Sequence, residues 1–250
     1  MTIGPRLAFA WLTVVPVRGP DTVDRKAAGI AIAWAPIVGV VLGASACAVL
    51  WLLISAGASS PVAGLLAVGV LALSTRGMHL DGLADTADGL GSYGPPERAR
   101  EIMKSGSAGP FGVAAIVFAI ALQAFSFAAI ADEERWFAVV LAVAIARVAV
   151  VAACRRGTTA APGTGFGALV AGTQSPITIS AWCLVAVAAA YFAVPAHGWL
   201  GPLVVATTAL TVLILVRHCL RRLGGLSGDI LGAVIEITTA LAALGFSLAP

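Results

Sequence analysis

The chain has 250 residues, of which 60% are hydrophobic and 11% are charged, and its mean hydropathy is +0.99. Water-soluble domains carry about a quarter charged residues, so this composition excludes an ordinary soluble domain and is typical of a membrane protein. The net charge of +3 and the four scattered cysteines also argue against a nucleic-acid binder, a disordered chain and a disulfide scaffold. We therefore interpret residues 1–250 as a single membrane-embedded domain.

Long uncharged runs predict where the chain crosses the bilayer, because a helix needs about 20 apolar residues to cross the hydrocarbon. Seven runs of this kind occur, of which the second, fifth and sixth are short. The predicted fold is therefore all-α, a polytopic helical membrane protein with about seven transmembrane helices. The runs are Ile30–Ala56, Pro61–Thr75, Pro110–Ala131, Trp136–Cys154, Thr178–Val194, Gly201–Val216 and Ile230–Ala249.

The distribution of basic residues predicts the orientation of these spans, because cytoplasmic loops collect Lys and Arg. With the N-terminus in the cytoplasm, the inner segments hold thirteen of the fifteen basic residues. Of the other two, Arg135 lies outside and Arg147 lies within the fourth run. If the run 61–75 were a re-entrant loop, the basic stretch 76–104 would fall on the outer side and the pattern would break. We therefore predict a cytoplasmic N-terminus.

A group of acids lies in the inner stretch after the second run. Asp81, Asp85 and Asp88 are three of the twelve acids of the chain and fall within eight residues. On a helix, positions i, i+4 and i+7 lie within about 60° of one another, so the three carboxylates share one face. Gly82 lies between Asp81 and Asp85 and Gly89 follows Asp88, and these small residues allow a bulky group to approach.

Three carboxylates on one stripe repel one another unless a cation neutralises them, and oxygen ligands suit a hard ion such as Mg²⁺. We therefore hypothesise a Mg²⁺ site, in which the ion would in turn hold a phosphate group. The alternative is a solvated acidic face that pairs with Arg76 or Arg98. That alternative explains neither the glycines nor the absence of lysines among the acids.

Arginines in two further inner loops are candidates for binding the anionic groups of a ligand. Arg155 and Arg156 precede a tract rich in Gly and Thr, and Arg221 and Arg222 precede a Gly-rich turn that leads to Asp229. The structural alternatives are arginine anchors at the inner ends of helices and a carboxylate that favours a helix N-terminus.

Two charged residues lie inside predicted spans, where ions are costly and normally face the interior of the bundle. Glu236 lies about 10 Å deep in the last span at 1.5 Å per residue, and Arg147 lies at a similar depth in the fourth. We predict that they meet beneath the aspartates. His79, two residues before Asp81, is a candidate ligand or base, with a buried structural histidine as the alternative.

Four segments of the chain form a recognisable set. The most specific is His-Leu-Asp-Gly-Leu-Ala-Asp-Thr-Ala-Asp-Gly-Leu at 79–90. The supporting segments are Glu-Arg-Ala-Arg-Glu-Ile-Met-Lys at 97–104, Gly-Pro-Phe-Gly at 109–112 and Gly-Gly-Leu-Ser-Gly-Asp at 224–229. Together they resemble the cobalamin synthase or adenosylcobinamide-GDP ribazoletransferase family. The similarity spans nearly the whole chain, but Ser-Gly-Ser at 105–107 stands where many members carry a charged triplet, so no ionic role is predicted there.

This resemblance implies a Mg²⁺-dependent enzyme of the inner membrane in the late cobalamin pathway. Such an enzyme joins adenosylcobinamide-GDP to α-ribazole or its 5′-phosphate, and releases GMP. By motif position Asp81, Asp85 and Asp88 would bind the metal, and Asp229 belongs to the second motif. Among the three, Asp88 is our candidate for accepting the hydroxyl proton. Because a corrinoid is too large for a closed pocket, the resemblance also implies an open cavity on the cytoplasmic face.

Two other functions remain as alternatives. A CDP-alcohol phosphotransferase has an acidic motif that also begins Asp-Gly-x-x-Ala, but it expects Arg where this chain has Asp85. A secondary transporter would explain Arg147 and Glu236, but its carboxylates belong at mid-membrane rather than in an inner loop. Both a monomer and a homo-oligomer agree with the sequence.

Overall fold

The computed structural model describes residues 3–20, 22–163 and 165–248. Over these residues the regular structure is helical, and the β-structure consists of two isolated bridges. This confirms the predicted all-α fold. The helices in chain order are α1 (Ile3–Leu12), α2 (Arg25–Ala33), α3 (Ala35–Ser55), α4 (Ser60–Ser74), α5 (Met78–Gly91), α6 (Pro96–Met103), α7 (Pro110–Asp132), α8 (Trp136–Ala153), α9 (Gly165–Val170), α10 (Pro176–Ala190), the short 3₁₀ helix η1 (Pro195–His197), α11 (Leu200–Leu223) and α12 (Gly228–Ser247).

Long apolar helices dominate the chain and confirm a polytopic membrane protein. Among the described residues, α3, α7, α8, α11 and α12 are long and apolar enough to cross a membrane, and α4 with α5 makes a sixth span if this bent pair is counted as one. Helices α4 and α10 have 15 residues each, which is shorter than a perpendicular crossing requires. The count of seven spans and the cytoplasmic N-terminus therefore stay predictions.

A sharp turn separates α4 from the helix that carries the aspartates. Arg76 and Gly77 both adopt positive φ angles, 58° and 68°, and the axes of α4 and α5 differ by 92°. Glycine tolerates this left-handed conformation without steric cost, whereas a second consecutive side chain there would be strained. Because of the turn, α5 does not continue in the direction of α4.

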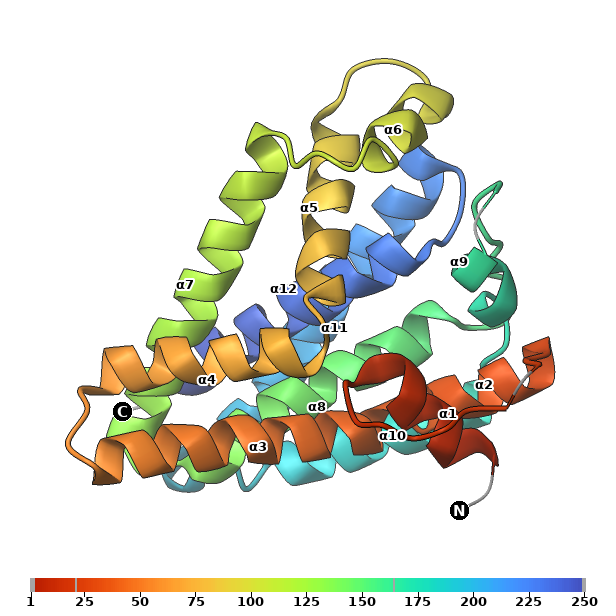
Figure 1. The fold of residues 1–250 in the computed structure, drawn as a ribbon. Helices are drawn as coiled ribbons and strands as arrows, with labels where there is room; N and C mark the ends of the chain where they lie inside the picture. The colour runs from red at the N-terminus through yellow and green to blue at the C-terminus, as the bar shows by residue number, and fades with distance from the viewer. Residues whose placement is uncertain (1–2, 21, 164, 249–250) are drawn as a thin grey trace.

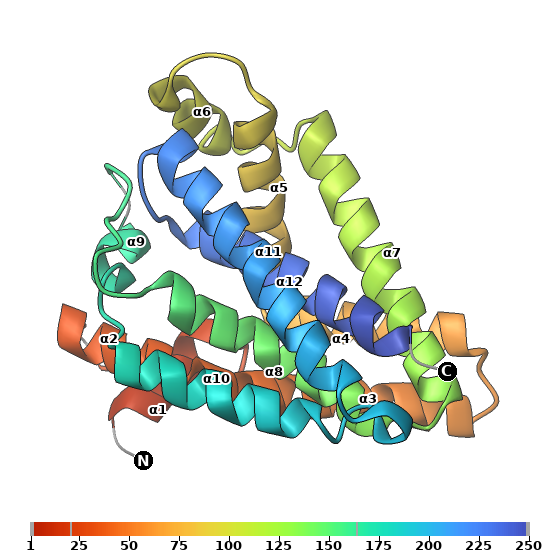
Figure 2. The ribbon, with the colours of Figure 1, turned by 180° about the vertical axis from the view of Figure 1, so that it is seen from behind.

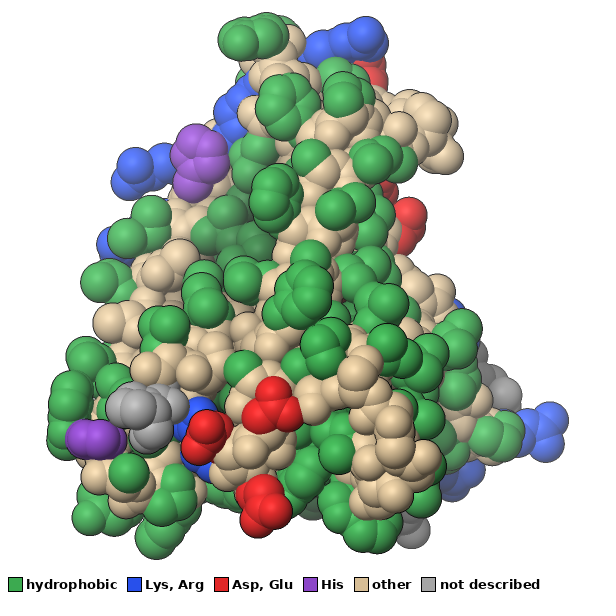
Figure 3. Space-filling model, turned by 90° about the vertical axis from the view of Figure 1, so that its left-hand side faces the viewer, with side chains coloured by type: hydrophobic (Ala, Val, Ile, Leu, Met, Phe, Trp, Pro, Cys, Tyr) green, Lys and Arg blue, Asp and Glu red, His purple; other side chains and the backbone are tan. Residues whose placement is uncertain are grey.

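The helices form two groups that meet at an angle (Figure 1). In this view α3, α4, α8 and α10 run across the base, whereas α7, α11 and α12 rise obliquely from it. Helix α5 stands between α7 and α12, with α6 above it, and the view from behind shows the same arrangement (Figure 2). On the face seen in Figure 3, hydrophobic side chains cover much of the surface, and charged side chains stand singly or in small groups among them. A largely apolar surface is expected for a protein surrounded by hydrocarbon.

Glycines allow the closest helix contacts at the base. Gly39 and Gly43 of α3 face α8, and a Cβ atom on Gly43 would lie 2.8 Å from the carbonyl oxygen of Val140. Close approach through small residues is a general mode of helix packing in membranes. It fixes α8, and with it Arg147, in the centre of the bundle.

Helix α6 is short and carries charged residues along one side. Ion pairs join Arg98 to Glu101 at 3.1 Å and Arg100 to Glu97 at 2.9 Å on its polar side. The Arg100 guanidinium also donates a hydrogen bond to the carbonyl oxygen of Leu223 at the end of α11, at 3.1 Å. Helix α6 is thereby tied to the ends of α5 and α11 and closes the polar end of the bundle.

Candidate active site

The acidic residues of α5 lie together and are joined by a fourth acid from α12. Asp85 interacts electrostatically with Asp81 and Asp88 on its own helix and with Asp229 in the first turn of α12. Asp81 is exposed, Asp85 is half-buried and Asp88 is buried. We call these four residues the acidic group.

Helices α5 and α12 can bring the acids together because glycines line the contact. A Cβ atom on Gly82 would lie 2.7 Å from the carbonyl oxygen of Asp229, and one on Gly232 would lie 3.0 Å from the carbonyl oxygen of His79. Such spacing leaves no room for a side chain at either position. Gly82, which lies between Asp81 and Asp85, therefore admits a neighbouring helix.

Asp88 has a different environment from the other acids. Its two carboxylate oxygens accept hydrogen bonds from the backbone N–H groups of Gly109, at 2.6 Å, and Gly112, at 2.9 Å. These groups lie at the start of α7, where backbone donors lack partners within the helix. Asp88 therefore anchors α7 to α5. This arrangement does not agree with the hypothesis that Asp88 is the aspartate left free to accept a proton.

Burial, together with repulsion within the acidic group, raises the pKa of Asp85. Partial burial raises the pKa of Asp85 to about 6, and the charges of Asp81, Asp229 and Asp88 contribute in the same direction. Within the described residues the ion pairs between side chains are the two on α6, so no Lys or Arg neutralises these acids directly. The acidic group therefore concentrates negative charge that is not paired with a basic side chain among the described residues.

Oxygen donors with uncompensated charge match the chemistry of a hard divalent cation. In the part of the chain that the structure describes, however, no three His, Cys, Asp or Glu side chains are close enough to form a ready metal site. The donor type therefore fits Mg²⁺, and the side chains of Asp81, Asp85 and Asp229 would have to draw together around it.

Two cations of α6 lie close to Asp229. Arg100 and Lys104 line a small cavity of about 20 Å³ together with Asp229 and Ser227. Arg100 is already paired with Glu97, whereas Lys104 is exposed and interacts electrostatically with Asp229. The sequence analysis did not select Lys104. The available signal was its position at the end of the charged helix, directly before the Gly/Ser stretch 105–109.

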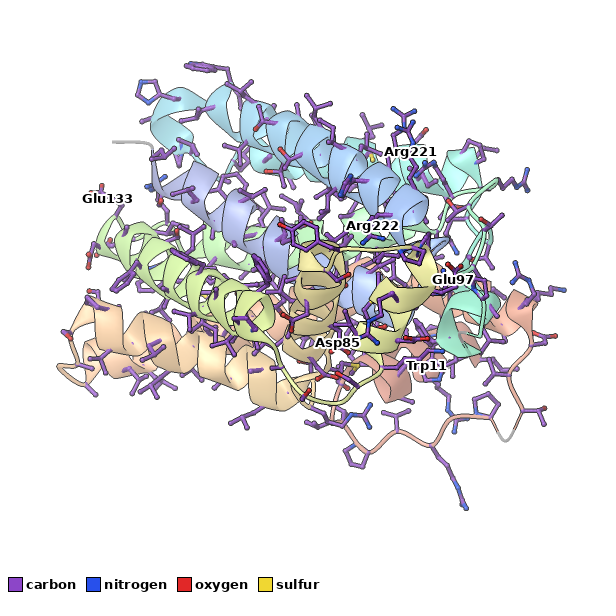
Figure 4. All side chains as sticks on the ribbon, turned by 90° about the horizontal axis from the view of Figure 1, so that it is seen from above. Trp11, Asp85, Glu97, Glu133, Arg221 and Arg222 are labelled. Atoms are coloured by element: carbon purple, nitrogen blue, oxygen red, sulfur yellow. The ribbon has the colours of Figure 1, made fainter. Side chains whose placement is uncertain are left out.

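The arginines of α11 do not lie beside Asp85. In the view from above, Asp85 lies on one side of α5, and Arg221 and Arg222 lie on the other side with α11 (Figure 4). Arg222 donates a hydrogen bond to the carbonyl oxygen of Ser92 at 2.8 Å, and Arg221 is exposed. Arg222 thus holds the end of α5.

The arginines after α8 are also separated from one another. Arg156 is exposed at the polar end, whereas Arg155 lines an apolar cavity between α8, α10, α11 and α12. The predicted contact of these four arginines with substrate rests on the sequence alone.

Arg147 and Glu236 line one small cavity of about 10 Å³ together with His79 and Gln123. Glu236 accepts a hydrogen bond from the Gln123 side chain at 2.8 Å, and Arg147 donates one to the carbonyl oxygen of Val143 at 3.2 Å. No direct ion pair joins Arg147 to Glu236 within the described residues. The predicted pair therefore faces a common cavity without touching.

His79 lines that cavity. Its Nε2 atom is buried and has no hydrogen-bond partner among the described residues. A cavity of this size holds about one water molecule, which would satisfy such an atom. The position agrees with a buried structural histidine rather than with a ligand or base. Gln123, which the sequence analysis missed, was detectable as the one amide side chain within the run 110–131.

The chain was compared with known families and proteins. The family model described as Cobalamin-5-phosphate synthase matches residues 4–247. The chain belongs to this family.

Several curated relatives named adenosylcobinamide-GDP ribazoletransferase support the same assignment. The protein from Corynebacterium diphtheriae is 36% identical over 251 residues, which cover 98% of this chain and 91% of the relative. The proteins from Corynebacterium efficiens and Frankia casuarinae are 37% and 38% identical, and the matches cover 98% and 96% of this chain and 90% and 92% of the relatives. No solved structure matches the chain significantly.

Membership of the Cobalamin-5-phosphate synthase family confirms the resemblance found in the sequence. The acidic group includes the three aspartates of the most specific motif and the aspartate of the Gly-Gly-Leu-Ser-Gly-Asp motif. The two motifs are about 140 residues apart in the chain, and they meet at the contact of α5 with α12. Neither alternative, a CDP-alcohol phosphotransferase or a secondary transporter, is the family that matches.

Proposed function

We propose that this chain is an adenosylcobinamide-GDP ribazoletransferase. It would join adenosylcobinamide-GDP to α-ribazole or its 5′-phosphate and give adenosylcobalamin or adenosylcobalamin 5′-phosphate, with GMP as the second product. The observation that carries the proposal is the family match over residues 4–247. The meeting of the two aspartate motifs at one place supports it.

The reaction exchanges one phosphorus–oxygen bond for another. A ribose hydroxyl of ribazole would attack the phosphorus next to the cobinamide, and the bond from that phosphorus to the bridging oxygen would break. GMP would leave with the bridging oxygen, and the hydroxyl proton would pass to water. Such transfers depend on positioning and on charge neutralisation rather than on covalent chemistry by the protein. An acidic group alone would repel the diphosphate.

A divalent cation would remove this repulsion. We propose that Asp81, Asp85 and Asp229 hold Mg²⁺. Asp88 would instead hold the start of α7 through the hydrogen bonds that it accepts from Gly109 and Gly112. When bound, Mg²⁺ supplies charge neutralisation for the diphosphate and for the departing GMP. The role of the three aspartates would be to hold this ion at the contact of α5 with α12.

Lys104 lies where a second positive charge, besides that of Mg²⁺, would help to bind the phosphates of the substrate. It shares a cavity wall with Asp229, and it is exposed at the end of α6. An ammonium group at this position would contact a phosphate oxygen of the substrate. Because the cavity is only about 20 Å³, the corrinoid itself would rest on the open surface beside it.

We expect Lys104→Ala to raise the KM for adenosylcobinamide-GDP about tenfold, since a charge-assisted hydrogen bond contributes about 1.5 kcal/mol or more. Steady-state GMP release at varied substrate concentration measures this effect. Lys26→Ala, which removes an exposed lysine from α2, serves as the matched control. An unchanged KM in Lys104→Ala would remove this residue from the proposed site.

The proposed location is the inner membrane with the acidic group on its cytoplasmic side. This orientation places thirteen of the fifteen basic residues in the cytoplasm, as the positive-inside rule requires. It also gives the polar end, with α5, α6 and the start of α12, access to water-soluble substrates.

A substrate comparison tests the proposed function. Purified protein in detergent receives adenosylcobinamide-GDP with α-ribazole, adenosylcobinamide-GDP with α-ribazole 5′-phosphate, or a CDP-linked lipid with an alcohol. The proposal expects GMP and a cobalamin product in at least one of the first two mixtures and no CMP in the third. Release of CMP without release of GMP would replace it by the CDP-alcohol phosphotransferase alternative.

A further inference from the structure

An apolar cavity far larger than the one beside Asp229 lies between α8, α10, α11 and α12. Its volume is about 210 Å³, and aliphatic side chains form nearly all of its wall. Arg155 is the charged residue on that wall. The cavity shares no lining residue with the acidic group or with the cavity around Arg147. The mechanism proposed above makes no use of it.

The mouth of this cavity opens toward the hydrocarbon. Leu213 of α11 lines the cavity and is 42% exposed, so the wall reaches the surface of the bundle. The neighbouring surface is apolar, because Leu184 of α10 and Leu210 and Ile214 of α11 are all more than half exposed. Figure 2 shows α10 and α11 diverging toward the polar end. A ligand that enters here therefore comes from the bilayer.

Arg155 is held at the polar end of the cavity by the backbone. A β-bridge joins Arg155 to Gln174, with hydrogen bonds of 3.0 Å from the Arg156 N–H to the Gln174 carbonyl and from the Gln174 N–H to the Cys154 carbonyl. These contacts fix the loop after α8 against the start of α10. The position of the Arg155 backbone at the end of the cavity is therefore set by the fold.

One nitrogen of this arginine lacks a partner. The Nη1 atom of Arg155 is buried and makes no hydrogen bond within the part of the chain that the structure describes. A buried charged donor without a partner is costly, and the cost is removed when the guanidinium turns toward an anion at hydrogen-bond distance. The phosphate diester of a lipid whose headgroup has no ammonium supplies the acceptor oxygens and a net negative charge, whereas the ammonium of phosphatidylcholine compensates that charge.

We propose that this cavity binds a membrane phospholipid with an anionic headgroup. Part of one acyl chain would fill the apolar cavity, and the phosphate would lie at the guanidinium of Arg155. Apolar lining, a mouth toward hydrocarbon and a cation at the polar end match the three parts of such a lipid. The bound lipid would bridge α8, α10 and α11, and the proposal does not depend on the catalytic function.

A cysteine in the cavity wall allows a direct test. Cys183 lines the cavity and is half-buried, and Cys47 on α3 is also half-buried but lies outside it. The intact protein is placed in nanodiscs of phosphatidylcholine alone or with phosphatidylglycerol. The rate of alkylation of each cysteine by a membrane-permeant maleimide is then followed by peptide mass spectrometry.

We expect phosphatidylglycerol at ten times its dissociation constant to slow alkylation of Cys183 about tenfold and to leave Cys47 unchanged. Arg155→Ala should abolish the protection and Arg155→Lys should retain part of it. Arg217→Ala, which removes an exposed arginine near the end of α11, should retain all of it. An unfolded variant is recognised because Cys47 and the buried Cys154 would then react faster.

Two results would overturn the proposal. One is equal alkylation of Cys183 in both membranes. The other is protection of Cys183 by α-ribazole 5′-phosphate in phosphatidylcholine nanodiscs, which would assign the cavity to a soluble phosphate ester with an apolar base. Both readouts are independent of catalysis, so an inactive but lipid-protected protein would contradict the proposed function and leave the lipid site intact.

Discussion

Replacing Asp81 by alanine is expected to lower the rate of GMP release about a thousandfold. Loss of one carboxylate weakens the proposed Mg²⁺ site, and a catalytic cation supplies several kcal/mol of charge stabilisation. Each 1.36 kcal/mol corresponds to about a tenfold change in rate. Asp81 is exposed, so its removal leaves the packing of α5 intact. The measurement is single-turnover GMP release across a range of Mg²⁺ concentrations, with a chelator-treated sample as the zero point.

Glu133→Ala is the matched control, because Glu133 is also exposed but lies at the far end of α7 from Asp85 (Figure 4). The control should keep full activity and an unchanged Mg²⁺ requirement. Activity of Asp81→Ala above a tenth of the parent, with the same half-saturating Mg²⁺ concentration, would contradict the metal assignment. Full activity of the parent after chelation would contradict it for the whole acidic group.

The acidic face of α5 was predictable because it depends on local spacing. Positions 81, 85 and 88 lie on one face of any helix, and α5 is a helix over that range. The long apolar helices were predictable for the same reason, since length and hydropathy are properties of a continuous segment. The break at Gly77 was not identified, although the short run before it indicated that the second span is unusual.

The partners of the acids were not predictable, because they come from distant segments. Asp88 was expected to be a free acid, and the fold places its carboxylate against the first N–H groups of α7. Asp229 was treated as part of a separate loop, and the contact with Gly82 places it in the acidic group. Spacing in one sequence determines which residues share a helix face, but it does not determine which helix covers that face.

The arginines show the converse case, in which residues that are close in the sequence lie on different sides of the fold. Arg221 and Arg222 follow each other in a Gly-rich stretch close to Asp229, which favoured a shared site. Helix α11 approaches α5 from the side opposite to Asp85, so the guanidinium of Arg222 contacts Ser92 instead. Proximity in sequence across a helix end therefore did not place these arginines beside Asp85, whereas Lys104, 125 residues before Asp229, lies close to Asp229.

Removal of the buried charge at Arg147 is expected to destabilise the protein by about 3–5 kcal/mol, because the charge of Glu236 across the cavity is then left uncompensated. Arg147 is 3% exposed, and the half-buried Glu236 lines the same cavity and is bonded to the neutral Gln123 side chain. Such a loss is a large part of the 5–15 kcal/mol that stabilises a typical protein. We therefore expect Arg147→Ala to lower the thermal unfolding temperature in detergent sharply, as followed by tryptophan fluorescence. Ile214→Ala, which truncates a residue that is 62% exposed, is the control for loss of side-chain volume.

A double variant separates charge compensation from packing. Arg147→Met combined with Glu236→Gln removes both charges, keeps most of the volume around the cavity and leaves an acceptor for the Gln123 amide. If the two charges compensate each other across the cavity, the double variant is more stable than Arg147→Met alone. Because His79 lines the same cavity and begins the helix that carries Asp81, recovered stability should also restore part of the GMP release. Full stability and full activity in both Arg147→Ala and Glu236→Ala would instead show that the two charges do not support each other or the helix above them.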